Sequence, residues 1–321
     1  MGIKNLNKFL RDKFEDVFIS IHLSEYAYKK VAIDISLYIH KYKAICGDKW
    51  LSAFIKLISS LRRNEIHCVF IFDGEAPKEK TAEREKRREE KEKLVKYVCD
   101  LEEALDNYHK TNVVDPILLK LYNQRPVSPK RLLGKGAESK FDIVWVEEKI
   151  NQKRNQIIDI GPQDFEYARE LFDILRVPYI TAIGEAEKMC AKLCIDGLVD
   201  AVLSEDTDVL AYGAPNFLSK IDTYNDNCML VNYDNLLAIM YITQEQFLDL
   251  CIMCGTDYNQ NIPKVGSHTA FKHLVVHKNI ENIGENTKLD ISILCHIRGR
   301  DLFTVFPDYG VSDIPYCGRP D

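Results

Sequence analysis

Short apolar runs alternate with longer amphipathic stretches along the chain, and this pattern predicts a sheet flanked by helices. Four runs have the length and the Val, Ile and Phe content of strands, at residues 29–35, 67–74, 176–180 and 200–205. Residues 49–63 and 165–176 place apolar side chains three and four positions apart, as in a helix with one buried face. Because strands that alternate with helices form mostly parallel sheets, we predict an α/β fold with a mostly parallel central sheet flanked by helices.

Acidic residues follow several of these predicted strands. Asp34 lies near the end of the first strand, Asp73 lies at the end of the second, and Asp206 and Asp208 follow the run at 200–205. In α/β sheets, sites form beyond the carboxyl ends of the strands. We therefore expect the chemistry of this protein at that edge of the sheet.

Residues 78–93, KEKTAEREKRREEKEK, are highly charged and have no apolar face. Drawn as a helix, the segment aligns five basic side chains in one stripe: Lys80, Arg84, Arg87, Arg88 and Lys91. A solvated helix stabilised by Glu–Lys pairs at four-residue spacing would explain this composition. A cationic surface that faces phosphate groups would explain it as well, and the composition alone leaves both interpretations open.

The remaining stretches give weaker or less regular indications of secondary structure. Residues 96–159 mix turn residues, bases and apolar patches, and we interpret them as an insertion of unpredicted fold. Residues 223–235 have the pattern of a hairpin, and residues 243–255 predict a helix that leads into 256–274. The last 40 or so residues carry little helix or strand pattern, so we expect them to be irregular.

Composition and charge exclude few functions. The chain has 321 residues, of which 46% are hydrophobic and 29% charged, as in ordinary globular proteins. Its net charge of −6 does not suggest a nucleic-acid-binding protein, but clustered acids can leave a basic face elsewhere. The start MGIKNLNKFL lacks the apolar segment of a signal peptide, and no apolar run reaches the roughly 18 residues that span a bilayer. We expect an intracellular protein without membrane association, and Leu6 stands where a myristoylation signal has Ser or Thr.

Ten cysteines are scattered along the chain, and we expect them to be reduced. Cys251 and Cys254, followed by His273 and His277, have the ligand order of a Cys2His2 zinc site. The two cysteines, however, lie in the apolar stretch FLDLCIMCG, where thiols pack as small hydrophobic groups. We favour core packing over zinc binding.

Seven acids are candidates for one site: Asp34, Asp73, Glu185, Glu187, Asp206, Asp208 and Asp257. Asp206 and Asp208 are two positions apart and share a direction if the chain there is extended. Glu185 and Glu187 precede an apolar helical stripe, so they converge only in the first turn of a helix. Taken singly, Glu at a helix start can complement the helix dipole, and Asp after a strand can begin a turn.

Acids gathered at one edge of a sheet repel each other unless a cation compensates their charge. Carboxylates without accompanying His or Cys ligands select Mg²⁺ or Mn²⁺. The candidates outnumber the ligands that one ion needs, which suggests two ions, the arrangement used for in-line attack on phosphodiesters.

Five blocks resemble the flap endonuclease (XPG-type) 5′-nucleases in order, spacing and context. They are VAIDIS with Asp34, FIFDGEAPKEK with Asp73, IGEAEKMCAKL with Glu185 and Glu187, SEDTDVLAYG with Asp206 and Asp208, and GTDY with Asp257. The start MGIKNL is similar to that of the family, and the resemblance covers residues 1–93 and 160–285. It implies the PIN-like 5′-nuclease fold with a helical arch, and a Mg²⁺-dependent nuclease that cuts flapped or branched DNA.

The resemblance also implies roles for single residues. Asp73, Glu185 and Glu187 would hold one Mg²⁺, and Asp206, Asp208 and Asp257 the second, with Mn²⁺ able to substitute. Asp34 would lie beside both ions and orient a metal-bound water. Lys80 and Arg87 match the basic pair that the family places over the scissile phosphate, where fixed cations stabilise developing negative charge.

The stretch IPKVGSHTAFKHL resembles the family's helix–two-turn–helix segment. Gly266 would let backbone amides approach phosphates, helped by Lys264, Ser267 and Thr269, and a K⁺ ion is possible there by analogy. A helix cap is the alternative role of Gly266. Four further residues are expected to contact DNA: Gly2, His40, Arg84 and Arg88.

The sequence departs from the family in several places. Asp73 follows Asp34 by only 39 residues, which leaves open whether the pocket for a one-nucleotide 3′ flap exists. His40 stands where the family has a Tyr that stacks on a base, and imidazole stacks less well. The arch region is longer than usual, and no sliding-clamp motif occurs. These features suggest a divergent member, with a virus among the possible sources.

We expect one compact nuclease domain with five regions. These are an N-terminal nuclease region (1–95), an arch or insertion (96–159), an internal nuclease region (160–235), a duplex-binding region (236–285) and a C-terminal extension (286–321). The leading hypothesis is a monomeric enzyme without a small-molecule cofactor that hydrolyses flapped or branched DNA in replication, repair or recombination and leaves a 5′-phosphate. A 5′-exonuclease, a Holliday-junction resolvase or an RNA-directed nuclease is the alternative within the family. A non-catalytic DNA-binding scaffold is the alternative of another class.

Overall fold

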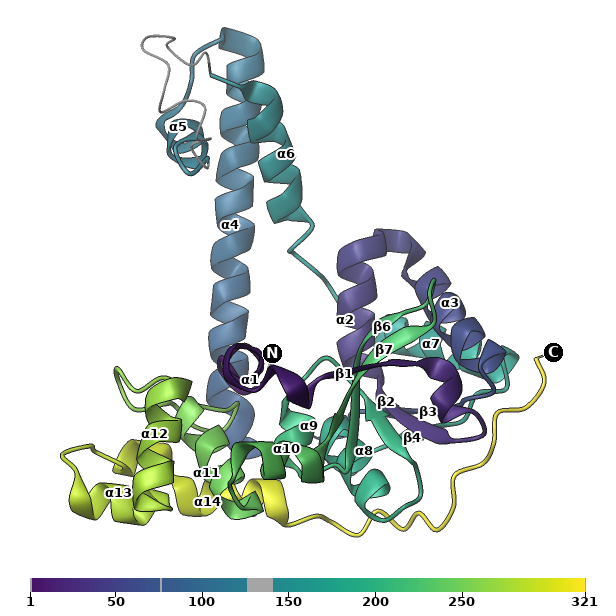
Figure 1. Ribbon diagram of the computed structural model, residues 1–321. Helices are drawn as coiled ribbons and strands as arrows, with labels where there is room; N and C mark the ends of the chain where they lie inside the picture. The colour runs from purple at the N-terminus through teal and green to yellow at the C-terminus, as the bar shows by residue number, and fades with distance from the viewer. Residues whose placement is uncertain (1, 76, 126–140, 321) are drawn as a thin grey trace. The chain divides into compact units, whose positions relative to one another are not determined.

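The computed structural model describes residues 2–75, 77–125 and 141–320 (Figure 1). The chain forms two compact units. The first unit comprises residues 1–81 and 160–321, and the second comprises residues 82–159.

Within the described residues, the first unit is built on a seven-stranded sheet. Its strands are β1 Ile19–His22, β2 Lys30–Asp34, β3 His67–Phe72, β4 Tyr179–Thr181, β5 Ala201–Leu203, β6 Asn216–Asp222 and β7 Asn227–Asn232. They lie in the order β1-β7-β6-β5-β2-β3-β4. The strands from β6 to β4 are parallel, whereas β7 and β1 join one edge in antiparallel pairs. The predicted mostly parallel α/β fold is confirmed.

Helices cover both faces of this sheet. One face carries α2 Ile35–Cys46, α3 Trp50–Arg63 and α7 Pro162–Ile174. The other face carries α1 Leu6–Lys13, α8 Ala186–Ile195, α9 Asp208–Ala211, α10 Tyr233–Met240 and α11 Gln244–Cys254. Side chains of β2 enter the two cores alternately, with Val31 and Ile33 on the first face and Ala32 on the second. Because both faces are buried, the central strands are continuous apolar runs, and that is why the sequence reveals them.

The edge strands are less visible in the sequence. The runs at 29–35, 67–74 and 200–205 contain β2, β3 and β5, whereas β4 begins at Tyr179, near the end of its run. A hairpin is present, but of its two strands only β7 lies within the expected range 223–235, because β6 ends at Asp222. The sequence pattern does not predict β1, because three of its four side chains are exposed and no apolar run marks it.

Four helices at the end of the first unit pack together. After α11 come α12 Ser267–His277, α13 Ile280–Asn286 and α14 His296–Thr304. The buried Asp249 of α11 binds both Nε and Nη2 of Arg300 in α14, at 2.7 and 2.8 Å, and Arg300 also binds Glu281 of α13. The expectation of an irregular last 40 residues is therefore wrong for α14, whose apolar side chains Leu302 and Phe303 are too few to show a helical period.

Residues 305–320 lack regular secondary structure, as expected. Phe306 lies beside Tyr212, and residues 313–317 run along the starts of β2 and β3. Asp313 pairs with Lys30 at 3.1 Å, and the amide of Cys317 donates to His67 Nδ1 at 3.2 Å. Ile314 is 1% exposed and belongs to the core. This tail is thus anchored along the edge of the sheet opposite the carboxyl ends of the strands.

The second unit consists of helices. They are α4 Thr81–Thr111, α5 Pro116–Tyr122 and α6 Ile143–Arg154, and residues 126–140 of the insertion lie outside the described residues. Figure 1 shows α6 running beside α4, and Leu101, Leu118 and Val146 bring the three helices into one small core. α4 runs through the boundary that we expected between residues 95 and 96.

The charged segment 78–93 is helical from Thr81 onward, whereas Lys80 lies in the 3₁₀ turn that precedes α4. Several of its charges pair along the helix, including Arg87 with Glu83 at 3.3 Å and Arg88 with Glu92 at 3.6 Å. The Glu–basic pairing of the solvated interpretation is therefore present, and Lys80 does not belong to the helical stripe.

The structure agrees with core packing of the cysteine pair. Cys251 and Cys254 are buried in α11, and all ten cysteines are free thiols. His273 and His277 lie one turn apart on α12, where their rings stack on each other at 6.0 Å.

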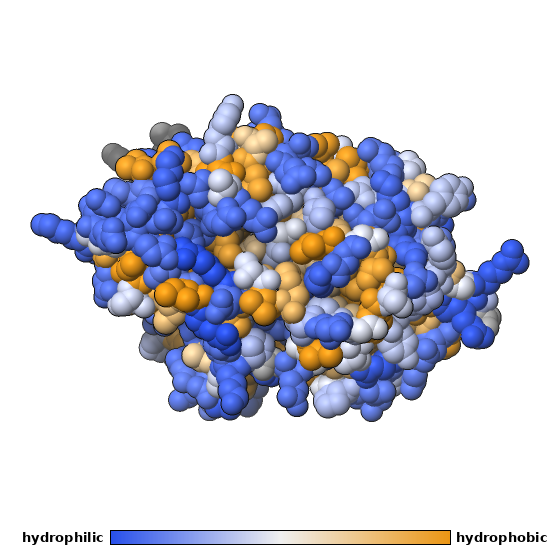
Figure 2. Space-filling view, turned by 90° about the horizontal axis from the view of Figure 1, so that it is seen from below, coloured by the Kyte–Doolittle hydropathy of each residue, from blue (hydrophilic) through white to orange (hydrophobic). Residues whose placement is uncertain are grey.

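No helix in the described parts of the chain is by itself long and apolar enough to cross a membrane. The consecutive helices α10 and α11 together pass that test of length and composition, but they meet at an angle of 84°. On the face shown in Figure 2, exposed apolar side chains form several separate groups with hydrophilic side chains between them.

Candidate active site

The seven candidate acids come from the carboxyl ends of the strands or from the segments that follow them. Asp34 is the last residue of β2, and Asp73 follows β3. Glu185 and Glu187 begin α8, Asp206 and Asp208 follow β5, and Asp257 follows α11. The parallel order β5-β2-β3-β4 is what brings these segments to one edge of the sheet.

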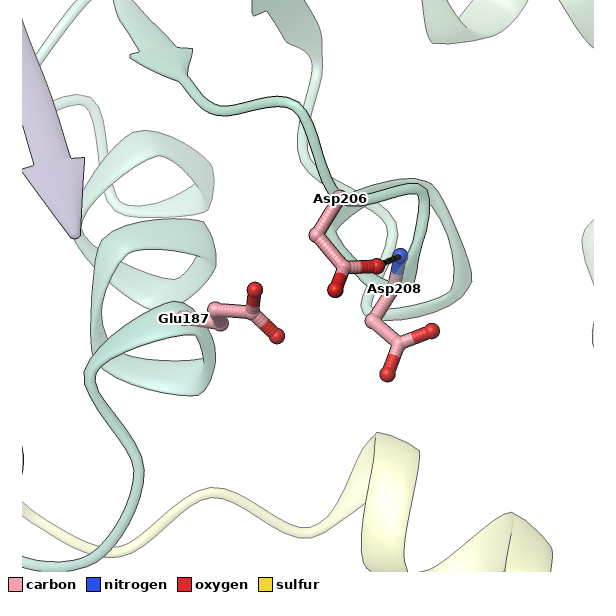
Figure 3. Close-up of side chains that lie close together, drawn as sticks. All are labelled: Glu187, Asp206 and Asp208. Atoms are coloured by element: carbon pink, nitrogen blue, oxygen red, sulfur yellow. Dashed lines mark hydrogen bonds between the residues drawn. The ribbon is translucent and has the colours of Figure 1, made fainter. Parts of the chain in front are cut away.

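Three of these acids form a tight cluster. Glu187, Asp206 and Asp208 each offer a carboxylate oxygen, and these oxygens lie within 4.8 Å of one another. Figure 3 shows Glu187 on its helix pointing toward the two aspartates across a small gap. Opposite ligands of an octahedral Mg²⁺ lie about 4.2 Å apart, so small adjustments would bring the three oxygens onto one ion.

Asp206 and Asp208 approach each other in a way that the sequence analysis did not foresee. The chain does not stay extended after β5 but turns into the short helix α9, which begins at Asp208. Within this turn the amide of Asp208 donates to Asp206 Oδ1 at 3.1 Å (Figure 3). The condition of an extended chain is therefore not met, and a turn instead brings the two carboxylates together.

Glu185 and Glu187 lie at the start of a helix, as the sequence analysis required for the two carboxylates to converge. Glu185 is the N-cap of α8 and Glu187 lies in its first turn. Glu187 lies within reach of Asp206 and Asp208, whereas the expected ligand sets grouped it with Asp73 and Glu185.

Asp34 and Asp73 are joined by Ser36, a residue that the sequence analysis missed. Asp34 Oδ1 accepts a hydrogen bond from the Ser36 amide at 2.8 Å and thereby caps α2. The Ser36 hydroxyl donates to Asp73 Oδ2 at 2.6 Å, and the amide of Ala186 donates to Asp73 Oδ1 at 2.9 Å. The only signal in the sequence was the position of Ser36, two residues after an acid that ends a strand.

Lys80 lies among the acids. Its Nζ is 2.5 Å from Glu185 Oε1 and 3.0 Å from Asp257 Oδ2. Burial alone would lower the pKa of Lys80, but the carboxylates of Glu185 and Asp257 outweigh it and raise the pKa above its ordinary value. The ammonium group therefore stays charged and offsets part of the local negative charge.

A pair of tyrosines, which the sequence analysis also missed, supports Glu185. The hydroxyl of Tyr258 donates to Glu185 Oε2, and the hydroxyl of Tyr212 lies 2.7 Å from that of Tyr258. Tyr258 is the last residue of the motif GTDY, and that place beside Asp257 was the available signal. Lys80 and Tyr258 thus hold the two oxygens of Glu185.

The acids are under electrostatic strain that a cation would relieve. Burial, followed by neighbouring carboxylates, raises the pKa of Asp34, Glu187 and Asp208 well above the ordinary range, and burial also raises the pKa of Asp206. Oδ1 of Asp208 is buried without a hydrogen-bond partner in the described residues. Buried carboxylates of this kind, with an unused oxygen and no His or Cys beside them, fit a hard divalent cation.

Gly2 lies against this acidic cluster. A Cβ atom on Gly2 would lie 1.7 Å from Asp206 Oδ1 and 3.1 Å from Asp208 Oδ1. Its φ of +82° also belongs to the region that favours glycine. No other residue fits at this position without moving the acids.

The other candidates for DNA contact lie at the start of α12, on α2 and in the second unit. Lys264, Gly266 and Thr269 are exposed at the start of α12, whereas Ser267 is buried there. Gly266 is the N-cap of α12 and has a φ of −93°, so the cap that we weighed as an alternative is present, but at the amino end of a helix. His40 is exposed on α2, and Arg84, Arg87 and Arg88 belong to α4 of the second unit.

Glu205, between Ser204 and Asp206, turns to a different partner. Its carboxylate binds Lys41 Nζ of α2 at 2.6 Å. It does not belong to the cluster of Glu187, Asp206 and Asp208.

Comparison with known proteins agrees with this geometry. The XPG N-terminal domain family matches residues 1–94, and the XPG I-region family matches residues 176–257. A probable RAD2-like endonuclease of Invertebrate iridescent virus 6 is 34% identical over 345 residues, which cover 98% of this chain and 82% of the relative. The chain belongs to the XPG and RAD2-like endonuclease family. Flap endonuclease 1 of Zea mays, a more distant relative, is 29% identical over 90% of this chain and 70% of its own.

Solved structures of XPG-type proteins share the fold. The catalytic core of Rad2, solved in complex with a DNA substrate, aligns with all of this chain and 92% of its own, with a TM-score of 0.66 and 17% identity. Human GEN1, solved in complex with Holliday junction DNA, aligns with all of this chain and 70% of its own, with a TM-score of 0.61 and 20% identity. At these identities, the similarity bears on the fold of the XPG-type chain and not on its substrate.

Proposed function

We propose that the chain is a Mg²⁺-dependent, structure-specific 5′-nuclease that hydrolyses a phosphodiester in flapped or branched DNA and leaves a 5′-phosphate. The observation that carries this proposal is the gathering of seven acids at the carboxyl edge of the sheet, with Glu187, Asp206 and Asp208 within reach of one ion. Mn²⁺ would replace Mg²⁺, because both prefer carboxylate oxygens. The family membership and the names of the relatives support the same activity.

The acids would hold two ions. Glu187, Asp206 and Asp208 would hold one, and Asp34, Asp73, Glu185 and Asp257 would hold or surround the second. When bound, such ions activate water and neutralise charge on the transferred phosphate. The chain itself keeps the ligands in place, because Ser36 and Ala186 fix Asp73 while Lys80 and Tyr258 fix Glu185.

Lys80 and Arg87 are proposed to face the scissile phosphate. Fixed cations at that point stabilise the charge that develops in the transition state rather than the bound substrate. Lys80→Ala and Arg87→Ala should then lower the single-turnover cleavage rate much more than the affinity for DNA. An equal loss in rate and affinity would show that these residues only position the DNA.

The DNA duplex is proposed to bind at the start of α12. The exposed Gly266 leaves the first amides of this 11-residue helix open to a phosphate, with Lys264, Ser267 and Thr269 nearby and a K⁺ ion possible at the turn. His40 would stack on a base, and Arg84 and Arg88 would contact phosphates. We further propose that the protein acts as a monomer on DNA inside a cell, in replication or repair, without a small-molecule cofactor.

The deciding experiment is a panel of labelled substrates incubated with purified protein and Mg²⁺. A 5′ flap, a nicked duplex, a four-way junction and an RNA strand separate the flap nuclease from the exonuclease, the resolvase and an RNA-directed nuclease. We expect cleavage near the junction of the flap substrate, loss of cleavage with EDTA and its return with Mn²⁺. Preferential symmetrical cuts in the four-way junction would replace this proposal by a resolvase.

A non-catalytic DNA-binding scaffold is the remaining alternative. It predicts no cleavage of any substrate in the panel, and equal DNA binding by the wild type and Asp206→Ala. Retention of all seven acids in the chain favours the enzyme.

A further inference from the structure

The amino-terminal helix α1 carries basic side chains on the side opposite its buried face. Leu6, Phe9 and Leu10 are buried in the core, whereas Lys4 and Lys8 are exposed. Lys8 lies in the first turn of α1, whereas Lys4 precedes the helix and its left-handed N-cap Asn5. The first turn of α1 contains no acid, and Asp12 is the acidic residue within its span. The exposed side of this amino-terminal segment is therefore cationic although the whole chain has a net charge of −6.

One end of α1 is tied to the acidic cluster. Gly2 lies so close to Asp206 and Asp208 that a Cβ atom would overlap Asp206 Oδ1. Two residues later, the amide of Lys4 donates to the carbonyl oxygen of Gly255 at 3.1 Å, just before the segment with Asp257. At about 3.4 Å per extended residue and 1.5 Å per helical residue, Lys8 lies within roughly 15 Å of Gly2.

The other side of α1 packs on α12. The ring of Phe9 lies 5.0 Å from that of His268 and 5.4 Å from that of Phe271, and Phe14 also contacts Phe271. The side chain of Lys4 passes the loop before α12, because a Cβ atom on Gly255 would meet both Lys4 Cδ and Asn261. The segment that carries Lys4 and Lys8 thus begins beside the acids and packs on α12, whose exposed start carries Lys264 and Gly266.

We propose that Lys4 and Lys8 bind phosphates of the DNA duplex between the acidic cluster and the start of α12, so that α1 belongs to the duplex-binding surface. This inference rests on the proposed nuclease function. The stretch from Gly2 to Lys8, at most roughly 15 Å long, corresponds to no more than about four nucleotides along one strand of B-form DNA. Two exposed ammonium groups, one on α1 and one on the segment before it, can reach neighbouring phosphates in such a run, and they carry no information about base sequence.

The test compares Lys4→Gln/Lys8→Gln with a control of equal charge change, Lys29→Gln/Lys56→Gln. Lys29 is exposed beside the start of β2, at the end opposite Asp34, and Lys56 is exposed on α3, across the sheet from α1. Both pairs of substitutions are made in an Asp208→Asn background, which prevents cleavage. Binding of a branched duplex is then measured at about 50–200 mM salt, where the affinity depends strongly on phosphate contacts. Cleavage at saturating DNA is measured with Asp208 intact, and thermal unfolding checks that all variants fold.

We expect Lys4→Gln/Lys8→Gln to bind the DNA at least about tenfold more weakly than the wild type near 0.15 M salt. The slope of log K against log salt should become shallower by about 2, one unit for each lost phosphate contact. The loss should fall on affinity and KM rather than on the rate at saturating DNA, and the control should match the wild type. Equal binding by the two variants would overturn the inference while leaving the nuclease proposal intact. A similar loss of rate at saturating DNA would overturn it too, since α1 would then act on the acids. Failure of the wild type to cut or bind any branched DNA would instead refute the nuclease function.

Discussion

At the scale of single residues, neighbouring acids in one short stretch have different environments. Asp208 is buried in the cluster with an unpartnered oxygen, whereas Glu205 forms an ion pair with Lys41, in which both side chains are about one-third exposed. Asp208→Asn should lower the Mg²⁺-dependent cleavage rate by about 10²-fold or more, since an ion ligand there contributes several kcal/mol. Glu205→Gln removes only a partly exposed ion pair and should leave the rate within about threefold of the wild type.

Steady-state cleavage assays on the flap substrate measure the rates of both variants in parallel. The two substitutions change the charge by the same amount three positions apart, so each is the control of the other. If Glu205→Gln lost as much activity as Asp208→Asn, total negative charge rather than ligand geometry would govern the site.

The hydroxyl of Tyr258 provides a second prediction at this scale. It donates to Glu185 Oε2, and a hydrogen bond to a charged group contributes about 1.5 kcal/mol, so Tyr258→Phe should weaken Mn²⁺ binding about tenfold. The measurement is a Mn²⁺ titration followed by electron paramagnetic resonance on the protein without DNA. Tyr212→Phe is the control, because Tyr212 contacts Tyr258 and not Glu185, and should change the affinity less. Unchanged Mn²⁺ affinity in Tyr258→Phe would show that this contact does not orient a ligand.

At the scale of elements, the sequence predicts the buried parts of the fold better than the parts that bend. β2 and β3 are evident because both faces are buried, which makes them continuous apolar runs. β1 is mostly exposed and α14 is short, so neither leaves a periodic signal. The acids were found by their position after strands, but their contacts depend on the turn into α9 and on Ser36, which are tertiary features that no local pattern encodes.

The packing of α11, α13 and α14 gives a prediction about pH. Hydrogen bonds from Arg300 lower the pKa of Glu281 from 4.5 to about 2. A carboxyl with a lowered pKa stabilises the fold above its unfolded pKa, and this contribution disappears as the pH falls from about 4.5 toward 2. Because Glu281 is 45% exposed, solvent screening limits the effect to about 1 kcal/mol or less.

Urea unfolding of the wild type and Glu281→Gln at several pH values measures this contribution. We expect a difference in the free energy of unfolding at about pH 8, where Glu281 is ionised in both the folded and the unfolded state. The difference should shrink below about pH 4.5 and vanish near pH 2. Glu285→Gln, an exposed change on the same helix α13, should show neither the offset nor its loss. A difference that persists unchanged at low pH would mean that Glu281 stabilises the helices by packing rather than by its charge.

At the scale of the first unit, the sheet separates catalysis from anchoring. The acids lie at the carboxyl ends of the parallel strands, while Asp313 and Cys317 of the tail bind Lys30 and His67 at the opposite ends of β2 and β3. A strand of five or six residues spans about 17–20 Å, so this part of the tail is too far from the acids to touch them. Changes in residues 313–317 should therefore act on stability without acting on the site.

Ile314 tests this separation, because it is the tail residue that enters the core and is 1% exposed. Ile314→Ala should lower the free energy of unfolding by about 2–4 kcal/mol, through the lost burial and the cavity that remains. Asp313→Asn is the matched surface change, since Asp313 is 80% exposed in its pair with Lys30, and should cost less than about 0.5 kcal/mol. Both variants should cleave the flap substrate at the wild-type rate at a temperature where they are folded. Loss of rate in fully folded Ile314→Ala would show that strain from the tail passes along β2 and β3 to Asp34 and Asp73, so that the sheet couples its two edges instead of separating them.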